Sequence, residues 1–155
     1  MNTSVHDLLE QLVGQQCCRQ HVGNDRSLFL GFGSLVRMES ALGDSVHGKW
    51  EIGTYNSCWR IVEGTTIVCG SRDFPDSVAE LKHTVDRLKL GRFCRLEQIT
   101  EFDVRVECDS GLYVDVLGTI SDDDEFLHVF CPEKRVVTFS AADQWRVGPS
   151  DEPWK

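Results

Sequence analysis

The stretch Asp103-Val-Arg-Val-Glu-Cys108 constrains the fold most, because its charged and apolar side chains alternate strictly. Successive side chains of a β-strand point to opposite faces, so the three apolar residues lie on one face and the three charged residues on the other. A turn, Asp109-Ser-Gly111, follows, and Leu112–Leu117 alternates again. The pattern predicts an antiparallel hairpin with one buried face.

Six further segments have the composition of strands. They are Leu28–Val36, Trp50–Tyr55, Cys58–Val62, Thr65–Cys69, Phe93–Ile99 and Val136–Phe139. A short Gly-containing turn separates Cys58–Val62 from Thr65–Cys69, so these two segments are expected to form a hairpin. Phe126–Cys131 is apolar on both faces, which predicts a central strand that is covered twice.

Two segments have helical periodicity. In the first, apolar residues recur at Val5, Leu8, Leu9, Leu12 and Val13, after Thr3 and Ser4, which can act as N-cap. The second lies near residues 77–90. It starts with a capping box, Ser77-Val-Ala-Glu80, and Gly91 is its expected stop.

Together these elements predict an α+β fold in one domain spanning residues 1–155. A mainly antiparallel sheet is expected to have its faces covered by the two helices. The C-terminal residues 145–155 are rich in Pro and Gly, which predicts an irregular tail that Trp145 and Trp154 fix to the body.

The chain has neither a signal-peptide pattern at its N-terminus nor an apolar run of the ~20 residues that a bilayer span requires. We therefore expect a cytoplasmic protein with no membrane partner. The seven cysteines are an odd number, which favours free thiols over a disulfide framework.

Negative charge is concentrated in one window. Of 25 acidic and 16 basic residues in the chain, residues 97–125 hold ten acids and a single base, Arg105. The net charge of −9 therefore arises entirely in this window. Nucleic acid is an unsuitable partner, because phosphate binding needs basic surfaces.

The run Asp122-Asp-Asp-Glu125 precedes an apolar strand and has several interpretations. It lacks the central Gly and the spacing of a helix-loop-helix calcium site. A looser Mg²⁺ or Ca²⁺ site, a solvated turn and a surface for a basic partner all stay open.

Other catalytic and cofactor patterns are weak. Gly31-Phe-Gly33 lacks the third Gly of a dinucleotide fingerprint, and there is no phosphate loop, Cys-x-x-Cys or Gly-x-Ser-x-Gly. Cys131 with His128, or Cys58 with any His, is a conceivable nucleophile and base, but His128 alternates with two Phe residues and is expected to be packed. No cofactor is predicted. Trp50 and Trp59 are expected to anchor the core.

Two stretches, Gly53–Val62 and Trp145–Trp154, are similar to those of small uncharacterised bacterial proteins. Some groups of that kind resemble immunity proteins that neutralise secreted toxins. The resemblance implies a binding role and identifies no functional residue.

Our first hypothesis is a non-enzymatic module that docks a basic protein, such as a toxin, on an acidic β-surface. The predicted binding residues are Asp103, Glu107, Asp115, Asp122, Asp123 and Asp124. The alternatives are a carboxylate-based metal-binding protein or hydrolase-like enzyme, and an oligomeric scaffold.

Overall fold

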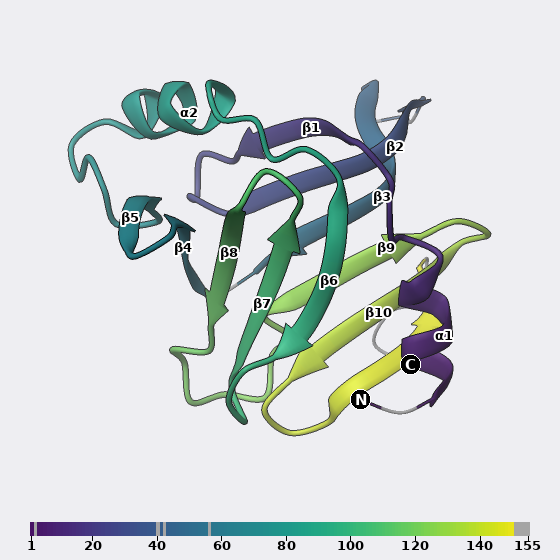
Figure 1. Cartoon of the computed structure of the whole chain (residues 1–155). Helices are drawn as coiled ribbons and strands as arrows, with labels where there is room; N and C mark the ends of the chain where they lie inside the picture. Colours follow the sequence, from purple (N-terminus) through teal and green to yellow (C-terminus); the bar gives the residue numbers. More distant parts are fainter. Residues whose placement is uncertain (2, 40, 42, 56, 151–155) are drawn as a thin grey trace.

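A computed structural model describes residues 1, 3–39, 41, 43–55 and 57–150, which form two helices and eleven strands in two antiparallel sheets (Figure 1). One sheet has the order β1-β2-β3-β9-β10-β11 and the other β5-β4-β8-β7-β6. The strands are β1 Cys17–Val22, β2 Leu28–Met38, β3 Ser45–Thr54, β4 Cys58–Glu63, β5 Thr66–Gly70, β6 Phe93–Gln98, β7 Asp103–Cys108, β8 Leu112–Leu117, β9 Leu127–Cys131, β10 Arg135–Ser140 and β11 Gln144–Pro149. The predicted α+β class is confirmed.

The core lies between the two sheets. Apolar side chains from the inner face of the five-stranded sheet and from the six-stranded sheet belong to one buried cluster. They include Ile61, Val104, Val106, Val114 and Val116 on one side, and Ile52, Leu127, Val129, Val137 and Phe139 on the other. The burial of β7 alternates as its sequence predicts. The predicted central strand is also confirmed, because β9 lies between β3 and β10.

The two helices lie beside the sheets. Helix α1 (Thr3–Glu10) buries Val5, Leu8 and Leu9 next to β11, and α2 (Val78–Asp86) packs mainly against β1 (Figure 1). The two helices pack against the sheets as predicted, while the apolar inner face of each sheet is covered by the other sheet. Neither described helix is long and apolar enough to cross a membrane.

Helix α2 begins as its capping sequence predicts. The Ser77 hydroxyl accepts a hydrogen bond from the backbone N–H of Glu80 at 3.4 Å. The helix ends at Asp86, short of the expected 90. It connects β5 and β6, the two opposite edges of the five-stranded sheet. These two strands run parallel, because four successive antiparallel pairings relate them.

The predicted irregular tail is wrong over residues 145–149. Strand β11 pairs with β10 along its whole length, and its outer edge position tolerates Pro149. Trp145 is buried, lies 4.6 Å from the Phe139 ring, and donates a hydrogen bond to the Gln98 side chain at 3.0 Å. It fixes the strand to the body as expected. Trp154 and the rest of 151–155 lie outside the described residues.

His128 is packed in the centre of the six-stranded sheet. Only 3% of it is exposed, and its ring lies 4.5 Å from the Tyr55 ring and 5.9 Å from the Phe130 ring. This confirms the prediction of a packed histidine. Burial lowers the pKa of His128 from 6.5 to about 4.

We predict that His128 makes stability depend on pH. The unfolded imidazole takes up a proton as pH falls below about 6.5, whereas the folded one stays neutral down to about pH 4. The free energy of unfolding therefore falls between these values, by about 2–3 kcal/mol from pH 7 to pH 4.5. Urea denaturation of the wild type and His128→Phe at both pH values isolates this contribution. Equal losses in both proteins would contradict it.

Candidate functional site on the outer face of the five-stranded sheet

The charged side chains of β7 and β8 gather on the outer face of the five-stranded sheet. Among the described elements, neither helix nor the second sheet covers this face (Figure 1). The strand register places Arg60, Asp115, Arg105 and Glu97 in one row across four strands. A neighbouring row holds Tyr113, Glu107 and Arg95.

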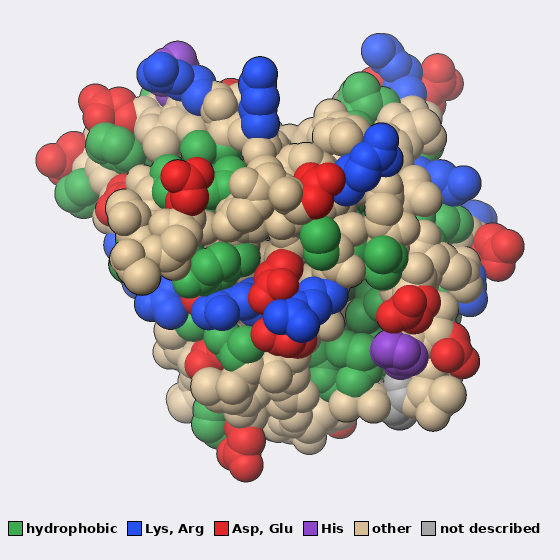
Figure 2. Space-filling model, in the orientation of Figure 1, with side chains coloured by type: hydrophobic (Ala, Val, Ile, Leu, Met, Phe, Trp, Pro, Cys, Tyr) green, Lys and Arg blue, Asp and Glu red, His purple; other side chains and the backbone are tan. Residues whose placement is uncertain are grey.

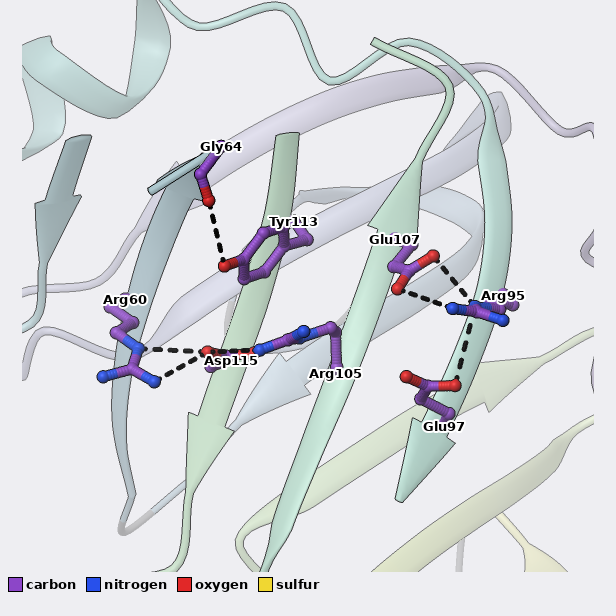
Figure 3. A network of polar contacts seen from close by, with 8 residues as sticks. All are labelled: Arg60, Gly64, Arg95, Glu97, Arg105, Glu107, Tyr113 and Asp115. Carbon is purple, nitrogen blue, oxygen red and sulfur yellow. Dashed lines mark hydrogen bonds and ion pairs between the residues drawn. The ribbon is translucent and has the colours of Figure 1, made fainter. Parts of the chain in front are cut away.

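Asp115 is at the centre of this face and is fully buried, with 0% exposure. Arg60 Nε donates to its Oδ2 at 3.0 Å, while Arg105 Nε donates to its Oδ1 at 2.7 Å and Arg105 Nη2 to its Oδ2 at 3.2 Å (Figure 3). The guanidinium carbon of Arg105 also lies 4.0 Å from the centroid of the Tyr113 ring. Its hydrogen bonds to Asp115 raise the pKa of Arg105. Asp115 is thus covered by two cations.

Glu107 is paired in the same way. Arg95 Nε and Nη2 donate to its two carboxylate oxygens at 2.8 and 2.9 Å, and Arg95 Nε also lies 3.6 Å from a Glu97 oxygen (Figure 3). The hydrogen bonds from Arg95 to Glu107, and the charge of that carboxylate, raise the pKa of Arg95.

The predicted open acidic row is therefore wrong for Glu107 and Asp115. Three arginines and three carboxylates form two adjacent clusters, Arg60–Asp115–Arg105 and Glu107–Arg95–Glu97, that together carry no net charge (Figure 3). Two of the arginines, Arg60 and Arg95, lie before the acidic window in the sequence. Figure 2 shows basic and acidic side chains interleaved across this face in place of a continuous acidic surface.

Asp103 lies at the end of the same face, where β8 leaves the sheet. Its carboxylate accepts hydrogen bonds from the Thr100 hydroxyl at 2.8 Å and from the backbone N–H of Gly118 at 3.2 Å. These bonds hold the turn before β7 and the beginning of the β8–β9 connection together. We therefore assign Asp103 a local structural role.

The remaining predicted residues, Asp122–Asp124, lie in the connection that crosses from β8 in one sheet to β9 in the other. Residues 121–124 are exposed and form no helix or strand. Asp122 Oδ1 accepts a hydrogen bond from the Asp124 backbone N–H at 3.2 Å. Within the described ranges, no ion pair neutralises Asp122 or Asp123. We call residues 121–125 the acidic loop.

Sequence reasoning missed Arg60, Arg95 and Tyr113. Arg60 and Tyr113 each occupy an outward position in an alternating strand, which is a visible signal. Their meeting with Asp115 or Glu107 depends on strand order and register, which the alternation does not determine.

The outer face of the five-stranded sheet holds no metal centre among the described residues. Among the residues that the structure describes, no group of three carboxylate, imidazole or thiol side chains is placed to hold a metal ion. All seven cysteines are free thiols, as predicted. Burial raises the pKa of Cys131 to about 12, so it is not an activated nucleophile beside His128.

No protein-family model, curated protein or solved structure matches this chain.

We predict that Asp115→Asn destabilises the protein by about 2–3 kcal/mol. A broken buried ion pair costs roughly 3–5 kcal/mol, but Arg60 and Arg105 are 42% and 26% exposed and regain part of their hydration. Urea denaturation at pH 7 measures the change. The matched control is Glu107→Gln, whose more exposed ion pair contributes little to stability. Similar losses in the two variants would contradict the central role of Asp115.

Proposed function

We propose that this chain is a non-enzymatic protein-binding module that docks a basic protein through the acidic loop. The observation that supports this most directly is the contrast between two sets of acids. On the outer sheet face they are paired with arginines, whereas the loop presents four consecutive acids, three of them exposed.

Long-range electrostatics favour a basic partner. When the paired Arg60 and Arg95 are added to the acidic window, ten acids still face three bases. Such a field accelerates encounter with a cationic surface. It is screened over ~8 Å at physiological ionic strength, so the association should depend on salt.

Short-range contacts are available on the outer face beside the loop. Arg and Tyr are enriched among the residues that dominate protein interfaces. Here Arg60, Arg105 and Tyr113 are held by Asp115 and by one another, so docking orders few additional side-chain rotamers. In this proposal the loop attracts the partner, and these residues form the contact.

Gly53–Val62 and Trp145–Trp154 resemble small uncharacterised bacterial proteins, some groups of which resemble immunity proteins. This resemblance supports a secreted toxin as the kind of partner. The carboxylate-based metal protein or enzyme stays an alternative prediction. The oligomeric scaffold is the other alternative.

Affinity capture with matched variants tests the proposal. The immobilised protein is incubated with source lysate at low salt and then eluted at high salt. We expect a basic protein to be retained and released. Asp122→Asn combined with Asp123→Asn and Asp124→Asn should reduce its retention at least about tenfold, because three of the charges that attract the partner are lost.

The control carries the same chemical change elsewhere. It combines Asp7→Asn, Asp44→Asn and Asp86→Asn, three exposed positions outside the acidic window. It alters net charge by the same amount and should retain the partner like the wild type. Equal losses in both triple variants would show that only net charge matters. Retention that survives the loop substitutions would contradict the proposed site.

A further inference from the structure

A second site lies at the start of β4, in a cavity of about 330 Å³. Its lining combines a thiol, Cys58, with the hydroxyl-bearing residues Ser57, Ser71 and Thr119 and the cation Arg72. These side chains come from three separated parts of the chain: β4, the segment after β5 and the β8–β9 connection. The cavity is open to solvent, and Cys58 is partly exposed within it.

Three donor side chains line the cavity around the sulfur of Cys58. The Thr119 hydroxyl donates to Sγ at 3.7 Å, and Ser71 and Arg72 line the same cavity. Ser71 Oγ accepts a bond from the Trp59 backbone N–H, which leaves its own proton for the sulfur. Such an arrangement stabilises a thiolate, because donors and a positive charge favour the ionised form.

Hydrogen bonds fix the backbone of residues 70–74, which carries Ser71 and Arg72. Arg26 donates to the backbone carbonyls of Ser71, Asp73 and Phe74 at 3.2, 2.6 and 2.6 Å. Gly70 N–H also donates to the Asp73 carboxylate at 3.0 Å. The positions of Ser71 and Arg72 are therefore set before any reactant arrives.

Cys58 differs in its pKa shift from five other thiols of the chain. Its own burial raises its pKa, but the bonds from Thr119, Arg72 and Ser71 and the charge of Arg72 outweigh that effect and lower it below its ordinary value. Burial instead raises the pKa of the thiols of Cys17, Cys18, Cys69, Cys108 and Cys131. Cys94 is the exposed thiol outside the cavity, and it serves as a reference for exposure alone.

We propose that the Cys58 cavity is an oxidative modification site, at which the thiolate reacts with a hydroperoxide. Sulfur attacks one peroxide oxygen, the S–O bond forms and the O–O bond breaks. Cysteine is oxidised by two electrons to a sulfenic acid, and hydrogen peroxide is reduced to hydroxide, which takes a proton from solvent. This inference does not rest on the proposed docking function.

The test compares Cys58 with Cys94 in the full chain. Reduced, desalted protein is exposed to hydrogen peroxide at pH 7 with dimedone present, and sulfenic acid at each cysteine is quantified by peptide mass spectrometry. We expect Cys58 to be labelled at least about fivefold faster than Cys94, since a lowered pKa increases the fraction of reactive thiolate at pH 7. Cys58→Ser should abolish the labelling at position 58 and leave the labelling of Cys94 unchanged.

Two variants test the role of the cavity. Arg72→Gln and Thr119→Val should each slow labelling of Cys58 by roughly threefold to tenfold, while Arg37→Gln, an exposed arginine on β2, should not. Unchanged labelling of Cys94 and protection of the buried thiols show that a variant is folded. Labelling of Cys94 as fast as Cys58 in the wild type would overturn the proposal. So would rates at Cys58 that neither cavity variant alters.

Discussion

The pairing of Asp115 with Arg60 and Arg105 determines what the outer face of the five-stranded sheet can present. A fully buried carboxylate on the solvent side of a sheet is costly unless charged donors replace the water that it loses. Here three strands supply the carboxylate and its two guanidinium groups in one cross-strand row. The arginines lie outermost, so the centre of the most acidic part of the chain is closed off from a partner by cations.

The acidic residues of the sheet and those of the β8–β9 connection are close in the sequence, but they have different roles in the structure. On the sheet, acids hold arginines in position, and a rigid, neutral surface results. In the β8–β9 connection, acids have no such partners in the described part of the chain at Asp122 and Asp123, and they extend from the point where the chain passes between the sheets. In the proposed docking, the negative charge of the loop attracts the partner and the ordered side chains beside it make the contacts.

Local patterns predicted much of the fold. Alternation identified the hairpin of β7 and β8, and the capping residues located the start of α2. The sequence did not predict the polar β1 or the Gly- and Pro-containing β11. Both are edge strands, and pairing with the neighbouring strand holds them in the sheet although their own residues do not favour a strand. The stacking of two sheets was also missed, since periodicity reports which face is buried and not what covers it.

The candidate site was predictable only in part. The outward direction of Asp103, Glu107 and Asp115 followed from alternation, but the pairing of Glu107 and Asp115 with arginines did not. Arg60 and Asp115 are 55 residues apart in the chain and meet only through the pairing of β4 with β8. A charge count over residues 97–125 omits Arg60 and Arg95, which lie outside this window and reach its carboxylates through strand pairing.

An NMR titration of the isotope-labelled protein with an oligolysine peptide at low salt tests most directly where the effective negative charge lies. The account predicts that amide shifts are largest in the acidic loop, residues 121–125, and diminish as salt is added. Shifts centred on β7 and β8 around Glu107 and Asp115, with the loop unaffected, would contradict it.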